Sequence, residues 1–320
     1  MPPPGAAAAA GRRPGRGACG PYCHRPAPDA PRPRRSIDSA GAAVVSCRHA
    51  PFDQRLAFIP GGSTGIGLAT AERLAAAGAD VAIFARRREP LEAAAAAIAA
   101  RRRRPEQRVA WRQCDVADAA QVAAVLGGAV AELGAPDLLI NCAGRAVPDY
   151  FERISAAQLD ETLRLNLAGT WHAIQVVLPH LRARRGGHIV NVSSLAGLIG
   201  VFGYTDYCAS KFALVGFSEA LRAELRRDGI AVSVLCPPDT DTPALAAENR
   251  TKPPETHAVS AGASLLSAGA VADALLAGIA RRRFLIIPGR EARLAYLAKR
   301  LFPGAVSWVM DRQVARVGKR

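Results

Sequence analysis

The sequence predicts a single α/β domain in which a doubly wound parallel sheet is covered by helices on both faces. From residue 56 onward, short apolar runs such as LAFI (56–59) and VAIF (81–84) alternate with longer segments of helical period. Sustained alternation of strands and crossover helices is typical of parallel sheets. Half of the 320 residues are apolar, enough to bury a large core.

The expected elements follow one another in strict order, and no tandem repeat of fixed period interrupts them. Strands are expected at 56–59, 81–84, 108–113, 137–141, 188–193 and 230–235. Helices are expected at 65–77, 88–104, 118–133, 156–183 and 206–228. The folded domain is therefore predicted to span residues 54–289.

Residues 1–53 are rich in Ala, Pro, Gly and Arg and almost lack aromatic residues. Such a composition buries too little surface to offset the entropy of ordering, so a disordered extension is predicted. Its Arg-rich, acid-poor character fits a transit peptide. A misassigned translation start would look the same, and both explanations stay open.

The formal net charge of +15 is concentrated at the two ends of the chain. Residues 1–55 carry nine Lys/Arg against three Asp/Glu, and residues 281–320 carry eleven against two, so the middle is formally neutral. Basic tails fit contact with anionic phospholipid headgroups about as well as with RNA or DNA. No interleaved basic and aromatic motif is present, so no nucleic-acid partner is expected.

The segment 290–320 is expected to be a basic amphipathic tail. Leu294, Leu297 and Leu301 recur at helical spacing, with basic residues on the other faces. An interfacial helix on a membrane and a helix that packs on the body or on a second subunit explain this spacing equally well. No apolar run approaches the ~20 residues needed to span a bilayer.

The chain has seven cysteines, an odd number. Four of them fall inside or beside apolar runs, where reduced, packed thiols are expected, and this favours a reducing compartment. Cys19, Cys23 and His24 lack a second pair at zinc spacing, so no metal site is predicted. The four are Cys114, Cys142, Cys208 and Cys236.

A glycine-rich turn, PGGSTGIG, follows the first expected strand and leads into the first helix. Gly61, Gly65 and Gly67 allow a sharp turn and a close approach to a pyrophosphate, and the helix N-terminus offers free N–H groups. Its position between a first strand and a first helix predicts a dinucleotide site of Rossmann type.

The second expected strand ends in FARRRE, where an enzyme that prefers NAD would place an acidic residue against the ribose hydroxyls. Ala85 leaves room there, and the guanidinium of Arg86 can bind a 2′-phosphate bidentately, which favours NADP. Arg87 and Arg88 are equally well explained as a solvated start of the next helix.

A serine, a tyrosine and a lysine form the expected catalytic core. Ser194 ends a strand, Tyr207 follows thirteen positions later, and Lys211 lies four positions further along the same predicted helix. Residues four apart share a helix face, so the phenol and the ammonium can act in one pocket. The ammonium is expected to lower the tyrosine pKa and make the phenol a general acid/base.

With these motifs in place, residues 54–287 resemble the short-chain dehydrogenase/reductase family. The resemblance implies that Ser194 orients a substrate carbonyl, Tyr207 donates the proton, Lys211 holds the nicotinamide ribose, and Asn166 of RLNLAG anchors a water relay. If the register slips by one, Ser193 replaces Ser194. The implied cofactor contacts are Gly61, Ser63, Thr64, Gly65, Ile66, Gly67, Arg86, Asp115, Val116, Asn141, Ala143, Gly144, Tyr207, Lys211, Pro237, Thr240 and Thr242.

Two positions depart from the family pattern. Pro60 stands where a threonine is usual, which removes a side-chain hydrogen bond from the turn. Pro238 replaces a glycine and changes the backbone beside the nicotinamide. Thr240 and Thr242 are both candidates to reach the carboxamide.

The run CPPDTDTPALAAENRTKPPET (236–256) is similar to that of 3-ketodihydrosphingosine reductases. This similarity implies NADPH-dependent reduction of 3-ketosphinganine to sphinganine. Asp239 or Asp241 is hypothesised to pair with the substrate ammonium, although both also fit turn-forming and helix-capping roles. Residues 243–265 correspond to the family's substrate lid, where Ala244, Leu245 and Val259 either line an acyl channel or only pack.

Two other functions compete with this one. The chain could reduce another lipophilic carbonyl, such as a 3-ketoacyl thioester or a steroid, or it could be a dinucleotide-binding scaffold without catalysis. The intact set of catalytic residues argues against the scaffold. The resemblance also implies a homo-oligomer paired through helices near 156–183 and 206–228. A cytoplasmic location, peripheral on a membrane, is expected.

Overall fold

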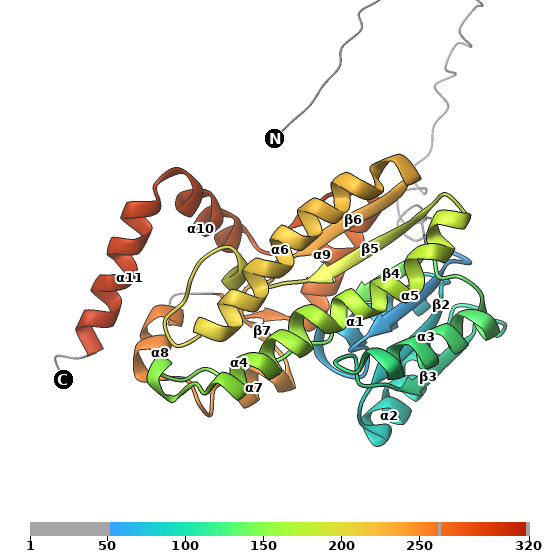
Figure 1. Ribbon diagram of the computed structural model, residues 1–320, viewed down its shortest axis with the longest axis horizontal. Coiled ribbons are helices and arrows are strands. Elements are labelled where there is room, and N and C mark those ends of the chain that lie inside the picture. Colours follow the sequence, from blue (N-terminus) through green and yellow to red (C-terminus); the bar gives the residue numbers. More distant parts are fainter. Residues whose placement is uncertain (1–51, 262–263, 318–320) are drawn as a thin grey trace, which may run out of the picture. The chain divides into compact units, whose positions relative to one another are not determined.

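The computed structural model describes residues 52–261 and 264–317, all of which fall in one compact unit (Figure 1). The predicted extension, residues 1–53, lies almost entirely outside the described residues, as do Cys19, Cys23 and His24.

Strands and helices alternate as the sequence predicts. The strands are β1 Leu56–Pro60, β2 Asp80–Ala85, β3 Val109–Gln113, β4 Leu138–Asn141, β5 Gly187–Val192, β6 Ile230–Leu235, β7 Thr240–Asp241, β8 Leu266–Ser267 and β9 Leu285–Ile286. The helices are α1 Gly65–Ala76, α2 Arg88–Ala99, α3 Ala119–Leu133, α4 Ala156–Leu163, α5 Gly169–Ala183, α6 Thr205–Leu225, α7 Pro243–Glu248, α8 Pro254–Ser260, α9 Ala268–Ala280, α10 Arg290–Leu301 and α11 Pro303–Val317.

Seven parallel strands form the main sheet in the order β3-β2-β1-β4-β5-β6-β9. The chain winds outward from β1 to β3 and then restarts at β4 on the other side of β1. Ligands bind doubly wound sheets at the carboxyl ends of the strands where the order reverses. The crevice above β1 and β4 is therefore where a dinucleotide is expected.

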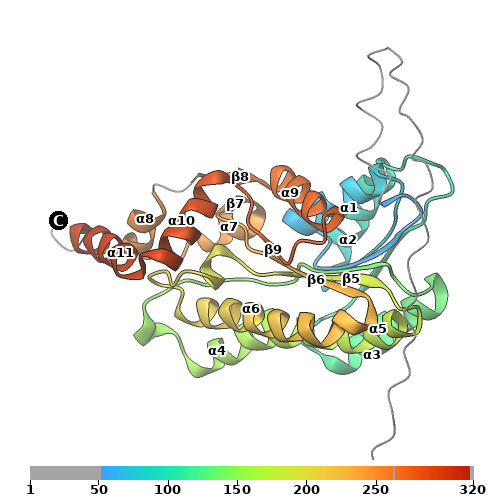
Figure 2. The same ribbon diagram turned by 90° about the horizontal axis from the view of Figure 1, so that it is seen from above.

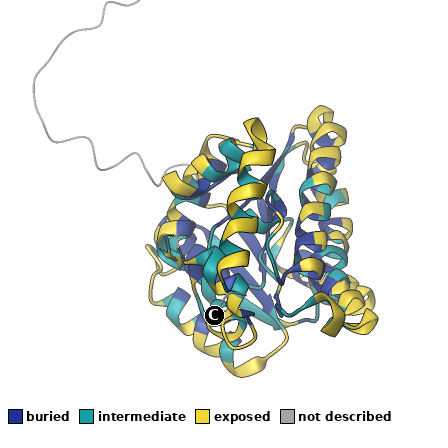
Figure 3. Ribbon diagram, turned by 90° about the vertical axis from the view of Figure 1, so that its left-hand side faces the viewer, coloured by how far each residue is buried: buried dark blue, intermediate teal, exposed yellow. Residues whose placement is uncertain are grey.

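Helices cover both faces of the sheet. Figure 2 shows α1, α2 and α9 on one face and α3, α5 and α6 on the other. Each face has its own apolar core: one is built around Ile59, Leu74 and Ile83, and the other around Phe58 and Leu126. The strands are the most buried part, and the outer helix surfaces are exposed (Figure 3).

Some boundaries differ from the sequence-based expectation. The long helix expected at 156–183 is interrupted by a π-helical turn, Arg164–Ala168, which separates α4 from α5. The helix expected at 88–104 ends at Ala99, ahead of the run of four arginines. Strand β9, which completes the sheet, and helix α9, which precedes it, were not expected. Their apolar segments do not show a distinctive strand or helix period.

The helices α10 and α11 follow β9, and α11 packs against α8 of the lid region. None of the described helices combines the length and the apolar character that crossing a membrane requires.

Candidate active site

The glycine-rich turn between β1 and α1 forms one wall of the main cavity. Gly61 and Gly65 have φ values of +81° and +56°, a region that glycine adopts readily and other residues rarely do. A Cβ on Gly61 would also overlap the backbone nitrogen of Ala143. These two glycines therefore bring the backbone close to the β4 end and leave the N-terminus of α1 open to an anion.

Pro60 does not disturb this turn. Its carbonyl oxygen accepts the Cys142 N–H at 2.8 Å, and the next residue, Gly61, donates its N–H to Phe84 at 2.7 Å. Backbone hydrogen bonds to β4 and β2 thus fix the turn without a side-chain hydroxyl at position 60.

Three arginines follow β2, and they have different surroundings. Arg88 forms an ion pair with Glu92 at 2.8 Å, and its guanidinium lies 5.7 Å from the centre of the Trp111 ring. Arg86 and Arg87 instead line the cavity. Neither pairs with a carboxylate within the described ranges, so both guanidinium groups are available to a phosphate.

Some of the residues predicted after β3 and β4 to contact the cofactor line the cavity, and one lies beneath it. Asp115, Val116, Ala143 and Gly144 line the cavity. Asn141 is not among the lining residues. It is buried in β4 and donates its amide to the Asn191 side chain at 2.9 Å, so it joins neighbouring strands beneath the site.

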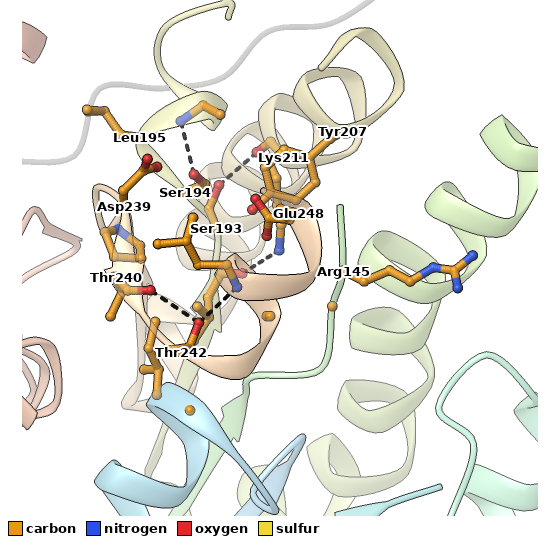
Figure 4. A pocket seen from close by; sticks show the side chains of 18 of the residues that line it. Arg145, Ser193, Ser194, Leu195, Tyr207, Lys211, Asp239, Thr240, Thr242 and Glu248 are labelled. Carbon is orange, nitrogen blue, oxygen red and sulfur yellow. Dashed lines mark hydrogen bonds between the residues drawn. The ribbon is translucent and has the colours of Figure 1, made fainter. Parts of the chain in front are cut away.

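Ser193 and Ser194 both line the cavity but differ in their hydrogen bonds. The Ser193 hydroxyl donates to the Lys211 backbone oxygen at 3.0 Å and is buried. The Ser194 oxygen accepts the Ala196 N–H at 3.1 Å, which leaves its proton to be donated into the cavity (Figure 4). The geometry favours Ser194 for contact with a carbonyl.

Tyr207 and Lys211 lie one turn apart on α6, as the spacing predicts. The Lys211 ammonium is 5.6 Å from the centre of the Tyr207 ring and donates to the Val192 carbonyl at 2.9 Å. Burial lowers the pKa of Lys211 to about 8, so the group is still mostly charged at neutral pH.

The pKa of Tyr207 shifts in the opposite direction to the one expected from the sequence. Burial raises it, the carboxylate of Glu248 raises it further, and a hydrogen bond with Ser194 opposes the rise. Desolvation of the phenolate is the largest of these influences on the pKa of Tyr207. The phenol therefore keeps its proton at neutral pH, and transfer of that proton requires a nearby positive charge to stabilise the phenolate.

Asn166 occupies the π-helical turn, a form that is frequent at functional sites. Its side-chain oxygen accepts the Arg145 N–H, and its amide donates to the Arg145 carbonyl and to Ser210, all at 3.0 Å. Asn166 is fully buried and does not line the cavity itself. It holds the chain after Gly144 against α6, and the water relay remains an expectation.

The loop after β6 carries the predicted Thr240 and Thr242. Both line the cavity, together with Pro237 and Pro238. Thr240 donates to the Pro238 carbonyl at 2.8 Å, and the Thr242 oxygen caps α7 by accepting the Leu245 N–H at 3.2 Å. Pro238 is thus accommodated in a closed turn at the edge of the cavity.

The two aspartates proposed to bind an ammonium lie in different places. Asp239 lines the cavity, but its carboxylate is 3.5 Å from the buried ammonium of Lys252. Asp241 is exposed and does not line the cavity. Asp206, which precedes Tyr207, is buried and accepts the Thr162 hydroxyl at 2.7 Å.

The cavity, of about 780 Å³, has both polar and apolar side chains in its lining. Helices of the lid and of the C-terminal segment contribute many of the apolar side chains. Sequence analysis did not assign the C-terminal helices to the cavity, because helical spacing alone does not show which surface a helix covers. The apolar lining includes Leu195, Ile199, Val201, Ala244, Leu245, Val259, Ala292, Ala295, Val306 and Met310.

Three residues at or beside the cavity, Tyr204, Glu248 and Lys252, were not predicted from the sequence. Tyr204 donates its hydroxyl to Glu248 at 3.0 Å, and both residues line the cavity. The polar character of the ENRTK run gave a signal for Glu248 and Lys252, but the run alone does not show which side chain faces inward.

The chain is similar to known proteins over most of the described residues. The short chain dehydrogenase family profile matches residues 55–253, more than half of the chain. A 3-dehydrosphinganine reductase of Danio rerio is 40% identical over 203 residues, covering 63% of this chain and 61% of that protein. A 3-ketodihydrosphingosine reductase of Bos taurus is 37% identical over 219 residues, covering 68% and 66%. The chain thus spans somewhat less than two thirds of the length of these two relatives.

A solved structure is also similar. The crystal structure of a short chain dehydrogenase/reductase from Burkholderia phymatum in complex with NAD has a TM-score of 0.68 and 28% identity. The match covers 78% of this chain and 95% of that one. The family match and the fold likeness support a nicotinamide dinucleotide as the cofactor. The chain belongs to the short-chain dehydrogenase family.

Proposed function

We propose that this protein reduces the 3-keto group of 3-ketosphinganine to sphinganine with NADPH, as an oxidoreductase of sphingolipid biosynthesis. The observation that carries the proposal is that one cavity is lined by Ser194 and Tyr207, by the glycine-rich turn with Arg86, and by apolar side chains of α7, α8, α10 and α11. Reduction of a long-chain ketone by a dinucleotide needs both the polar and the apolar lining. The names of the relatives, which describe reductases of this ketone, support the same choice.

The residues divide the chemistry among them. NADPH, when bound, supplies the hydride that adds to the carbonyl carbon. Ser194 donates a hydrogen bond to the carbonyl oxygen, and Tyr207 transfers its phenolic proton to that oxygen as the C–O double bond becomes single. The Lys211 ammonium stabilises the phenolate left on Tyr207 and is placed to contact the nicotinamide ribose. Asn166 supports this arrangement through Gly144 and Arg145.

The preference for NADPH over NADH is supported by the arginines after β2. Arg86 and Arg87 both line the cavity at the end of β2, where a 2′-phosphate is expected. The sequence analysis selected Arg86 alone, and the structure adds Arg87 as a second cation. Asp115 and Val116 are proposed to border the adenine, and Thr240 or Thr242 to reach the carboxamide.

The apolar lining suits the proposed substrate. Its alkyl chain would lie against the apolar side chains of α7, α8, α10 and α11. The direct test is to mix the purified protein with NADPH and 3-ketosphinganine and to follow the nicotinamide absorbance. Substrate-dependent oxidation of NADPH is expected. A faster reaction with a 3-ketoacyl thioester or a steroid ketone would replace this substrate with the alternative one.

Peripheral contact with an anionic membrane, on its cytoplasmic face, is also proposed. The outer surface of α10 and α11 exposes Leu294, Leu301, Phe302 and Trp308, the last two by 65% and 60%. Basic residues lie on the same two helices, a combination that suits a lipid headgroup layer. The free thiols Cys114, Cys142, Cys208 and Cys236 suit a reducing compartment. Co-sedimentation with phosphatidylserine vesicles, but not with phosphatidylcholine vesicles, tests the contact.

A homo-oligomer is proposed through α5 and α6. Trp171 on α5 and Phe212 on α6 are exposed by 48% and 45%, and the Trp171 ring stacks near Phe217. Large apolar side chains on adjacent helices are typical of a surface that a second subunit covers. Size-exclusion chromatography with light scattering would contradict this proposal if it gave the mass of one chain.

A further inference from the structure

A carboxylate lies next to the proposed proton donor without an obvious role in proton transfer. Glu248 is the last residue of α7, is partly buried and lines the cavity. Figure 4 shows it beside Tyr207 and Lys211, and its charge acts on the pKa of both residues. Glu248 therefore lies close to the atoms that would handle the carbonyl.

Glu248 makes the chemistry of Tyr207 harder when the cavity holds no cation. Its negative charge disfavours the phenolate and so raises the pKa of Tyr207. Burial raises the pKa of Glu248 itself, as does the neighbouring Asp239, while the hydrogen bond from Tyr204 and the charges of Lys252 and Lys211 oppose the rise without cancelling it. A carboxylate that is partly withdrawn from water in this position is stabilised by a positive charge beside it.

The cations around Glu248 do not pair with it. Lys252, with only 3% of its side chain exposed, pairs with Asp239 at 3.5 Å. Lys211 donates its hydrogen bond to Val192. Across the part of the chain that the structure describes, no Lys, Arg or His nitrogen lies within 4.0 Å of the Glu248 oxygens. Lys252 and Lys211 act on Glu248 only from a distance, so the carboxylate has no direct ion pair among the described residues and can accept one from a bound cation.

One oxygen of Glu248 is already held in place. Tyr204, which is buried, donates its hydroxyl to Oε2 at 3.0 Å, and the Tyr204 and Tyr207 rings lie 5.6 Å apart. The second oxygen, Oε1, accepts no hydrogen bond from the described residues. A carboxylate fixed by one oxygen, with the other facing a cavity, has the form of a binding group.

Resting on the proposed function, we infer that Glu248 binds the substrate ammonium and that Tyr204 is the positioning residue that orients Glu248. In 3-ketosphinganine the ammonium is on the carbon next to the ketone. A carbonyl oxygen held by Ser194 and Tyr207 therefore brings the ammonium into the neighbourhood of Glu248. Asp239, which Lys252 already neutralises, and the exposed Asp241 are less suited to this contact.

This contact also links recognition to proton transfer. The bound ammonium offsets the negative charge of Glu248 and so removes an influence that holds the proton on Tyr207. An amino ketone would then be reduced more readily than a plain ketone of equal length. Selectivity for the amine would follow from the charge of the site as well as from the contact itself.

The test compares 3-ketosphinganine with the des-amino ketone of the same chain length in Glu248→Gln. For the amino ketone, kcat/KM is expected to fall about 10- to 100-fold, as for loss of a hydrogen bond between charged groups. For the des-amino ketone it is expected to stay the same or to rise. In Tyr204→Phe, KM for the amino ketone is expected to rise several-fold, and by a larger factor than KM for the des-amino ketone.

Glu255→Gln is the matched control. Glu255 also accepts a tyrosine hydroxyl at 3.0 Å, that of Tyr150, and it lies in the same lid but not in the cavity lining. Its variant should leave both substrates unaffected. NADPH affinity and thermal unfolding, measured for every variant, report whether the fold and the cofactor crevice are intact.

The outcomes separate the two proposals. If the wild-type protein reduces both ketones and Glu248→Gln loses equally on both, the inference about Glu248 is wrong and the proposed function stands. If the wild-type protein reduces the des-amino ketone but not the amino ketone, the proposed function and the inference both fail. A loss confined to the amino ketone supports both.

Discussion

The two halves of the cavity are built in different ways. The cofactor half consists of short segments that each follow a strand, at 61–67, 86–87, 115–116 and 142–144, and backbone geometry dominates it. The substrate half combines Leu195, Ile199 and Val201, which follow β5, with side chains from α7, α8, α10 and α11, which the chain brings in after the main sheet is nearly complete. The first half is held by the sheet, and the second depends on how separate helices pack over it.

This difference explains how far a sequence can predict each half. Parallel strands place their carboxyl ends at one edge, so motifs that follow β1, β2, β3 and β4 must converge. A change in the cofactor half should therefore affect cofactor use alone, and a change in the substrate half should affect lipid use alone. Residues where the halves meet should affect turnover without affecting binding of the cofactor.

Tyr207→Phe changes a residue where the two halves of the cavity meet, and it should give the largest loss of turnover. Removing the phenolic hydroxyl deletes the proton donor, so kcat is expected to fall by about 10²- to 10⁴-fold, the usual contribution of general acid catalysis. NADPH affinity should be unchanged, because the ring and its packing against Tyr204 remain. Single-turnover rates and NADPH fluorescence titration measure the two quantities. Turnover that survives in this variant would refute the proposed role of Tyr207.

Arg86→Ala tests the cofactor half. Loss of one charged contact to the 2′-phosphate should raise KM for NADPH about 10- to 100-fold and leave KM for NADH nearly unchanged. Arg88→Ala is the matched control, because Arg88 is already engaged with Glu92 and Trp111. A smaller effect in Arg86→Ala than in Arg87→Ala would assign the phosphate to Arg87. A change in KM for the lipid would contradict the independence of the two halves.

Particular residues show what the sequence could and could not predict. The Gly61 turn, the Tyr207 and Lys211 pair and six of the seven main-sheet strands follow from local pattern and spacing. Glu248 and the apolar residues of α10 and α11 do not, because their positions depend on contacts between segments far apart in the chain. The direction of the Tyr207 pKa was predicted wrongly, since spacing shows the nearby ammonium but not the burial that outweighs it.

The Arg86 prediction has a similar limit. The sequence shows three consecutive arginines after β2, and only the structure shows that Arg88 turns to Glu92 while Arg87 remains at the cavity. A sequence can therefore predict that a run of arginines at a strand end binds a phosphate. Which arginine of the run faces the phosphate depends on side-chain packing, which the sequence does not show.

Lys211→Met tests how much the buried ammonium, which lies where the two halves of the cavity meet, lowers the free energy of unfolding. Lys211 is only 4% exposed, and burial lowers its pKa from 10.5 to about 8. Below pH 8 the folded protein holds a buried ammonium that the unfolded chain would solvate, which lowers stability. Between pH 8 and 10.5 the unfolded chain binds more protons than the folded one, so the free energy of unfolding rises with pH in this window.

A methionine of similar length carries no such penalty, although it gives up the hydrogen bond to Val192. Without cofactor at pH 7, Lys211→Met is expected to raise the free energy of unfolding, by an amount on the order of 1–3 kcal/mol, while abolishing turnover. The gain should shrink toward pH 10 as Lys211 of the wild type loses its proton. Denaturant unfolding at several pH values measures it. A Lys211→Met variant that is less stable than the wild type at pH 7 would contradict this prediction. It would show that the buried Lys211 ammonium stabilises the fold.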